Sequence, residues 1–149
     1  MTTRKDGAAL REIARLHIQA QRQTSACCGG TTLTQCAMIT QIGKEGALKI
    51  GELGSRLGLE KSWTGRAVER LTRHGLLAVD CDPADARGKR VSLTAAGRRR
   101  YAALNESLDA HAGSILDRIP REHRESVSRS LKLILEALQS ETRTKGERP

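Results

Sequence analysis

Aromatic residues are almost absent from this sequence, which has one Trp, one Tyr and no Phe in 149 residues. Proteins that bind single-stranded nucleic acids stack the bases on aromatic side chains, so the sequence disfavours that class. The hydrophobic core must consist of Leu, Ile, Val and Ala. The chain is nevertheless long enough for one domain with a substantial core.

Long apolar runs are absent as well. No segment approaches the roughly 18 apolar residues of a transmembrane helix, and the first residues, MTTRKDGAAL, lack the apolar core of a signal peptide. We therefore expect a cytoplasmic protein that does not bind membranes. The sequence has neither a phosphate-binding glycine loop nor a catalytic triad, so we expect no enzyme activity.

Acidic residues are outnumbered by basic ones. The chain has 26 Lys and Arg against 17 Asp and Glu, which gives a formal net charge of +9, and its pI is near 10.0. Such an excess of positive charge is typical of proteins that bind an acidic polymer, and nucleic acid is the first candidate. The alternative is a generally basic surface without a polymeric partner.

Helical spacing of apolar residues dominates the first half of the chain. It predicts a helix over residues 7–22, a helix that begins after Thr32, a short helix around Ile50–Leu57, and a helix from Ser62 to His74. Thr32 and Gln35 form the Thr-x-x-Gln pattern of a capping box. The stretch TSACCGG is expected to break the first helix, and Gly58 and Gly75 to end the third and fourth.

A charged β-hairpin follows in LLAVDCDPADARGKRVSLT. Leu77, Val79 and Cys81 alternate with polar or small residues, so we expect Cys81 to face the core. The Pro, Asp and Gly residues form the tip, and KRVSL is the return strand. Helical periodicity then resumes after a cap at Thr94 and again in a last helix that starts near Pro120.

The order helix, turn, helix, charged hairpin is that of a winged helix-turn-helix, so the predicted fold is mainly α with a small β-hairpin wing. In such units the second helix enters the major groove of DNA. The outward face of the helix from Ser62 to His74, with the residue before it, carries Lys61, Ser62, Gly65, Arg66, Glu69, Arg70 and Arg73. The alternative explanation for these charges is a solvated helix surface.

The segment from LTQCAMITQ to LTAAGRR, about residues 30–100, resembles the MarR family of transcription regulators. The most specific stretches are RLTRHGLL and DPADARGKRVSLTAAG, which is similar to the family's wing. The resemblance implies one MarR-like domain over residues 1–149. Its parts are a winged helix-turn-helix lobe at about 32–97, dimerisation helices at about 7–22 and 98–140 and a basic tail at 141–149.

Family membership would imply a homodimer that binds a pseudo-palindromic double-stranded DNA operator, usually as a repressor. By this resemblance, Arg87 of the wing enters the minor groove, Asp85 holds Arg87 in position, and Lys89 and Arg90 flank phosphates. The implied DNA-binding set is Lys61, Ser62, Trp63, Thr64, Arg66, Arg70, Arg73, Asp85, Arg87, Lys89 and Arg90. Ala86 departs from the family, where a second Arg is common. Trp63 is bulkier than the family's residue and packs either on the DNA backbone or in the core.

Three of the four cysteines lie in SACCGGTTLTQC, as Cys27, Cys28 and Cys36. Cys36 is near a helix start, which stabilises thiolate. We expect these thiols to bind a soft metal or metalloid ion, such as arsenite, mercury, cadmium, cuprous copper or zinc, and thereby to control DNA affinity. The first alternative is a redox switch that forms a disulfide. Two others are a small organic ligand, which family members often bind, and thiols that act only as small buried hydrophobes.

Overall fold

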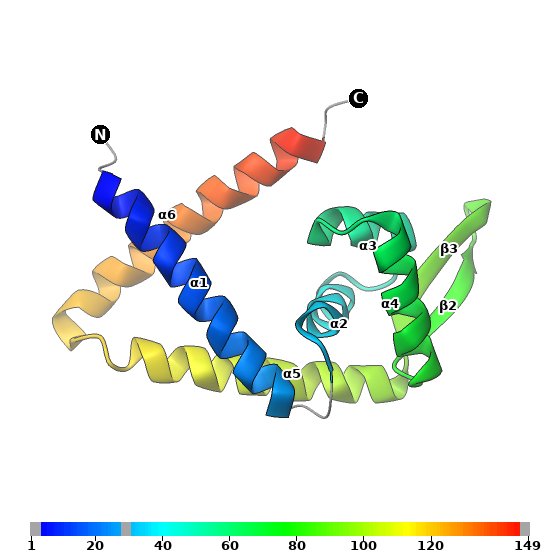
Figure 1. The fold of residues 1–149 in the computed structure, drawn as a ribbon, viewed down its shortest axis with the longest axis horizontal. Coiled ribbons are helices and arrows are strands. Elements are labelled where there is room, and N and C mark those ends of the chain that lie inside the picture. The colour runs from blue at the N-terminus through cyan, green and yellow to red at the C-terminus, as the bar shows by residue number, and fades with distance from the viewer. Residues whose placement is uncertain (1–3, 28–30, 147–149) are drawn as a thin grey trace. The chain divides into compact units, whose positions relative to one another are not determined.

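The computed structural model describes residues 4–27 and 31–146. These residues form six helices and three strands (Figure 1). In chain order they are α1 (Arg4–Cys27), α2 (Leu33–Glu45), β1 (Leu48–Lys49), α3 (Ile50–Leu57), α4 (Lys61–Arg73), β2 (Leu77–Asp82), β3 (Asp85–Leu93), α5 (Ala95–Leu116) and α6 (Arg121–Gly146). Residues up to Leu108 form one compact unit and residues from Asp109 form another, so α5 contributes to both.

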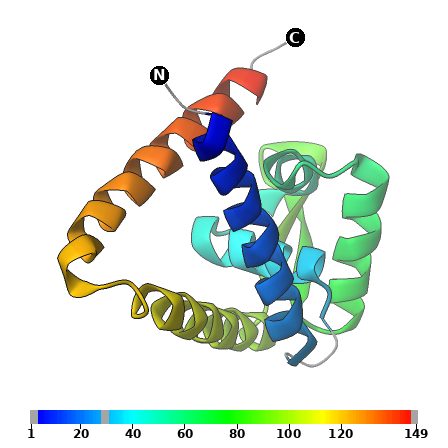
Figure 2. The same ribbon diagram turned by 60° about the vertical axis from the view of Figure 1, so that its left-hand side comes forward.

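Helix α2 is the centre of the first unit, with α3, α4 and the sheet around it (Figures 1 and 2). Its residues Met38, Ile39 and Ile42 are almost completely buried. Aliphatic side chains from the other elements complete this core: Leu48, Leu53, Val68, Leu71, Leu77, Val91, Leu93 and Leu104. Leu, Ile and Val therefore make up most of the core, as the composition predicts, and Met38 and Cys36 are buried with them.

Local signals fix the helix ends. The Thr32 hydroxyl accepts a hydrogen bond from the Gln35 N–H at 3.2 Å, and the Gln35 side chain accepts one from the Thr32 N–H at 3.0 Å. This confirms the predicted capping box at the start of α2. Gly58 ends α3 in the left-handed conformation, with φ 64°. The predicted end of α1 near residue 22 is wrong, because α1 continues to Cys27 and its sequence to that point contains no Pro and no Gly after Gly7.

The sheet is antiparallel and has the order β1-β3-β2. Leu77 lies opposite Leu93, and Val91 lies between Val79 on one side and Leu48 on the other. Strand β1 was not predicted, since two residues are too few for an alternating pattern. The return strand also begins earlier than KRVSL, at Asp85, and the pairing register shifts between Cys81 and Asp82.

Cys81 is exposed, so the prediction that it faces the core is wrong. It does lie on the same side of β2 as Leu77 and Val79, and its cross-strand partner is Lys89, which is also exposed. The alternating pattern of the strand therefore includes a position that is exposed in the structure. Periodicity alone therefore overestimates the depth of the core at this end of the strand.

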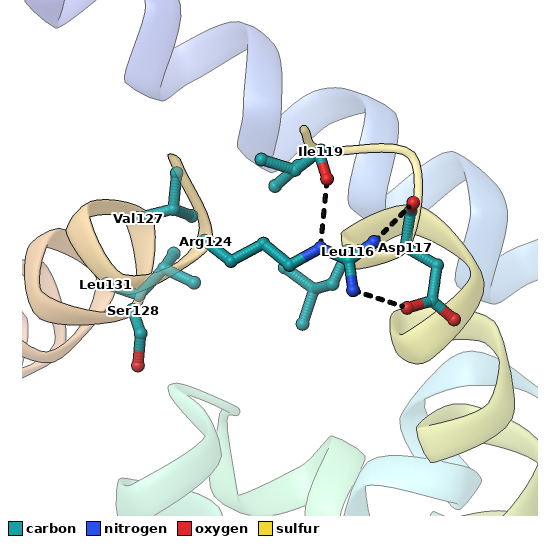
Figure 3. A pocket seen from close by; sticks show the side chains of 7 residues that line it. All are labelled: Leu116, Asp117, Ile119, Arg124, Val127, Ser128 and Leu131. Carbon is teal, nitrogen blue, oxygen red and sulfur yellow. Dashed lines mark hydrogen bonds and ion pairs between the residues drawn. The ribbon is translucent and has the colours of Figure 1, made fainter. Parts of the chain in front are cut away.

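In the second unit, α6 begins at Arg121, directly after Pro120. The Arg124 side chain donates to the carbonyl oxygens of Asp117 at 2.8 Å and Ile119 at 3.0 Å, and so holds the turn that follows α5 (Figure 3). Leu116, Val127 and Leu131 line the adjoining cavity of about 230 Å³. None of the helices in the described residues is long and apolar enough to cross a membrane.

Candidate nucleic-acid interface

Helix α4 has one buried face and one exposed, basic face. Val68 and Leu71 anchor the buried face in the core. The exposed face carries six of the predicted DNA-binding residues: Lys61, Ser62, Trp63, Arg66, Arg70 and Arg73. The helical repeat separates these residues from the core positions, so the exposed face is available to a partner.

Trp63 is a surface residue with 62% of its area exposed, which excludes the core position that the sequence left open. The guanidinium group of Arg66 lies over its ring, 5.2 Å from the ring centroid. This cation–π contact orients both side chains on the first turns of α4. A flat ring and a cation are thus presented together on the exposed face.

Thr64 is only 1% exposed, so it does not belong to this surface, contrary to the prediction. Its hydroxyl donates to the carbonyl oxygen of Glu60 at 2.9 Å. A Cβ atom added to Gly54 would lie 2.6 Å from the Thr64 hydroxyl oxygen. Thr64 and Gly54 therefore set the close approach of α3 and α4, which gives Thr64 a role in the fold.

A hollow of about 450 Å³ adjoins the basic face of α4. Thr32, Thr34 and Gln35 at the start of α2 line one part of it, and Arg66 and Arg70 line another. A helix start and arginine side chains both favour a negatively charged group, such as a DNA phosphate. Thr32 and Thr34 are not among the residues that the sequence predicts for DNA binding, although the capping box marks this helix start.

The wing tip presents Arg87 and Lys89, which are both exposed. The carboxylate of Asp85 accepts a hydrogen bond from the backbone N–H of Arg87 at 3.0 Å. The predicted contact between Asp85 and Arg87 is therefore present, but it fixes the backbone at the tip. The hydrogen bond therefore fixes the backbone from which the Arg87 side chain projects.

Arg90 is half-buried and its guanidinium donates to the carbonyl oxygen of Ala47 at 2.7 Å. The bond joins β3 to the segment that precedes β1. This contact gives Arg90 a role in the fold and takes one of its donors away from the phosphate contact that the sequence predicted. Ala47 is distant in sequence, so only the sheet reveals the pairing.

Asp82 is a buried carboxylate at the base of the wing tip, and it is not among the residues that the sequence predicts for DNA binding. Its side chain is 3% exposed and its Oδ2 lies 3.0 Å from the Nζ of Lys49. Its Oδ1 accepts a hydrogen bond from the Ala84 N–H at 3.1 Å. The Ala84 bond and the Lys49 ammonium hold the pKa of Asp82 below its usual value, and the carboxylate raises the pKa of Lys49.

The predicted thiol site lies only partly within the described residues. Cys36 is buried and, together with Leu33, Leu104 and Gln21, lines a cavity of about 260 Å³ in the first unit. Cys27 is the last residue of α1, its side chain is outside the described set, and Cys28 lies outside the described residues altogether. Within the part of the chain that the structure describes, no group of three His, Cys, Asp or Glu side chains could hold a metal ion.

Comparisons with known proteins agree with this geometry. A family model described as the MarR family matches residues 31–89. A MarR family protein from Bacillus stearothermophilus is 24% identical, with a TM-score of 0.82 over 93% of this chain and 99% of that chain. A mutant of MarR from E. coli is 16% identical, with a TM-score of 0.80 over 91% and 98%.

A third solved structure is that of BpsR from Bordetella bronchiseptica, whose DNA binding is described as regulated by 6-hydroxynicotinic acid. It is 23% identical, with a TM-score of 0.68 over 87% of this chain and 98% of that chain. These likenesses establish that this chain has the fold of these proteins. No curated protein matches the sequence.

Proposed function

We propose, from the premise that residues 31–89 of this chain are a MarR family domain, that the protein is a repressor that binds a specific double-stranded DNA operator. Members of this family are transcription regulators and not enzymes. One observation carries the proposal: a single compact unit exposes the basic face of α4 and a wing tip with Arg87. Major-groove contact by α4 and minor-groove contact by Arg87 would follow from that arrangement.

The protein is proposed to act as a homodimer. Helix α1 exposes Leu10, Ile13, Leu16 and Ile18, and α6 exposes Leu131, Ile134 and Leu135. Apolar residues at helical spacing on an exposed face are typical of a surface that is covered in the assembly. Two copies related by a twofold axis would present two α4 helices to the two half-sites of a pseudo-palindrome.

The DNA-binding proposal is tested by selection from a randomised duplex library, followed by affinity measurements on the enriched duplex. We expect Arg87→Ala to weaken binding by about tenfold, because a groove contact is lost. Arg15→Ala is the matched control, since it removes the same charge from an exposed position on α1, outside the winged helix-turn-helix lobe. The affinity of this variant for the enriched duplex should change by less than about twofold. Failure to enrich any duplex would contradict the proposal.

We propose further that the thiols of Cys27, Cys28 and Cys36 control DNA binding by taking up a soft metal or metalloid ion. The nearness of the three cysteines in sequence supports this: Cys27 ends α1, Cys28 is the next residue, and Cys36 belongs to α2. Thiolates are the preferred ligands of such ions. Oxidation of the same thiols to a disulfide is the alternative. In either case the effector would change the geometry of the dimer and hence the separation of the two α4 helices.

A small organic effector is a second candidate, which the cavity beside Cys36 favours. Leu33, Leu57, Leu104 and Leu108 supply apolar walls, and Gln21 and Gln41 supply polar groups. This lining, apolar with few polar groups, is typical of small-molecule sites. The ligand described for BpsR gives a first compound to test, 6-hydroxynicotinic acid.

Native mass spectrometry of the reduced protein separates these effectors. Titration with arsenite, mercuric, cadmium, cuprous and zinc ions would give a stoichiometric adduct, lost in Cys28→Ser, if the ion proposal is correct. Peroxide would instead remove two hydrogens per disulfide, and 6-hydroxynicotinic acid would add its own mass. Cys81→Ser is the control in each arm, because that thiol is exposed on the wing. No adduct and no oxidation would contradict the thiol proposal.

A further inference from the structure

We propose that Asp82 is a positioning residue for DNA recognition: it fixes the wing tip so that Arg87 is held in a defined place relative to α4. The inference rests on the proposed DNA-binding function and extends it to a residue that does not itself face DNA.

Asp82 first determines the shape of the tip. Its Oδ1 accepts the Ala84 N–H at 3.1 Å, which closes the turn at Pro83 and Ala84. Cys81 lies opposite Lys89, whereas Asp82 lies opposite Asp85, so the residues from Ala86 to Gly88 are displaced from the ladder. A Cβ atom on Gly88 would lie 3.2 Å from the Asp82 Cβ. The displaced segment, which contains Arg87, is therefore packed against Asp82.

Asp82 also connects the tip to the helix-turn-helix. Its Oδ2 lies 3.0 Å from the Nζ of Lys49, the second residue of β1. The next residue, Ile50, begins α3, and α3 packs against α4 where Gly54 meets Thr64. Lys49 also lies opposite Arg90 in the sheet. The ion pair thus links the wing tip, through β1 and α3, to the helix that is proposed to enter the major groove.

The burial of this carboxylate distinguishes a positioning role from an electrostatic one. A carboxylate near DNA repels phosphates, and its removal would on charge alone tighten binding. Asp82 is buried and pairs with Lys49 in the folded protein. Lys49 is 51% exposed, so Asp82→Asn leaves no buried charge without a partner, but it removes the ion pair that joins the tip to β1. We therefore expect loss of Asp82 to weaken DNA binding, whereas removal of a negative charge alone would tighten it.

The test compares four proteins on the duplex enriched from the randomised library: wild type, Asp82→Asn, Arg87→Ala and the double variant. We expect Asp82→Asn to weaken binding by about fivefold to tenfold in the wild type and by less than about twofold in the Arg87→Ala background, since coupled residues are not additive. This coupling would not arise from general destabilisation. Thermal unfolding of each protein records whether it is folded at the assay temperature.

Glu45→Gln is the matched control. It also removes one negative charge and one ion pair, that between Glu45 and Arg56 at 3.2 Å, but away from the wing. Its DNA affinity should be unchanged or slightly increased, with equal effects in the presence and absence of Arg87. If Asp82→Asn does not fold, Lys49→Gln replaces it, because that variant keeps the Ala84 bond, and it should show the same dependence on Arg87.

The outcomes separate the two proposals. Unchanged or tighter binding by Asp82→Asn, or an equal loss with and without Arg87, overturns the positioning role and leaves the DNA-binding function intact. Failure of the wild-type protein to enrich or bind any duplex overturns both. Weakening that disappears in the Arg87→Ala background supports the positioning role.

Discussion

At the residue scale, several glycines of this protein occupy places where no side chain fits. A Cβ atom on Gly43 would lie 2.5 Å from the ring of Tyr101, and one on Gly97 would lie 2.1 Å from the carbonyl oxygen of Leu76. Real Cβ atoms do not approach other atoms so closely. Gly43 therefore allows α2 to lie against α5, and Gly97 allows the start of α5 to lie against Leu76. Gly65, in contrast, has open space around its Cα.

The contrast between Gly97 and Gly65 gives a paired prediction. Gly97→Ala should destabilise the protein by about 2–3 kcal/mol, since the backbone oxygen of Leu76 cannot move away without breaking the end of the hairpin. Gly65→Ala should be neutral or stabilise by up to about 1 kcal/mol, because alanine is the better helix former. Urea unfolding followed by circular dichroism measures both. Equal stabilities of the two variants would contradict the packing at Gly97.

The ionisation of Asp82 gives a pH prediction. Its pKa is lowered by the Ala84 N–H and by Lys49, so the folded state favours the carboxylate. The ionised carboxylate therefore stabilises the folded protein fully at pH values above about 3.9, the pKa of an Asp in the unfolded chain. This stabilisation is lost as the pH falls through the lower pKa of Asp82 in the folded protein. The difference in unfolding free energy between wild type and Asp82→Asn should be constant near neutral pH and should decrease below about pH 4. A difference that stayed constant to about pH 2 would contradict this assignment.

At the scale of elements, the helix ends depend on a few short-range bonds. The capping box joins Thr32 and Gln35 in both directions. Thr94 serves α5 similarly, since its hydroxyl accepts the Gly97 N–H at 3.0 Å and donates to the Gly75 carbonyl at 2.6 Å. Such bonds satisfy backbone groups that a helix leaves unpaired at its start.

Loss of the cap at α2 should therefore be measurable. Thr32→Ala removes the acceptor for the Gln35 N–H and should cost about 1 kcal/mol of unfolding free energy. Thr34→Ala, in the first turn but not in the capping box, should cost less than about 0.5 kcal/mol. Urea unfolding of the two variants separates the cap from a general effect of losing a threonine. Similar losses in both variants would contradict the capping role.

At the scale of the whole molecule, the exposed apolar residues of α6 carry the assembly proposal. Leu131, Ile134 and Leu135 follow helical spacing and share a face, whereas Leu133 lies outside that stripe. Leu133 and Leu135 are 67% and 54% exposed. Two exposed leucines on the same helix therefore differ mainly in the face that they occupy.

This difference gives a test of the homodimer. Leu135→Glu places a charge on the shared face, so it should increase the dimer dissociation constant by at least about tenfold, and weaker DNA binding should follow. Leu133→Glu introduces the same group on another face and should leave the dimer intact. Sedimentation velocity over a concentration series measures both. Dimerisation unaffected by Leu135→Glu would contradict the proposed interface.

The amino-acid sequence predicts the order of the helices and the hairpin from α2 to β3, without the short strand β1, and also the capping box, the exposed basic face of α4 and the charged wing. These features depend on helical periodicity, on caps within three residues and on turn chemistry, all of which are local. The resemblance to the MarR family rests on the same contiguous residues. Within this stretch the chain order alone is enough to place Arg66 and Arg87 on exposed elements.

Tertiary structure alone decided the roles of several residues on those elements. Thr64 is buried because Gly54 lets α3 approach, and Arg90 is held by Ala47, which lies in another part of the chain. Cys81 is exposed although it continues the alternation of Leu77 and Val79, and Asp82 is buried with its Oδ2 3.0 Å from the Nζ of Lys49. Contacts between residues distant in sequence leave no period or local motif, so they become visible only when the chain is folded.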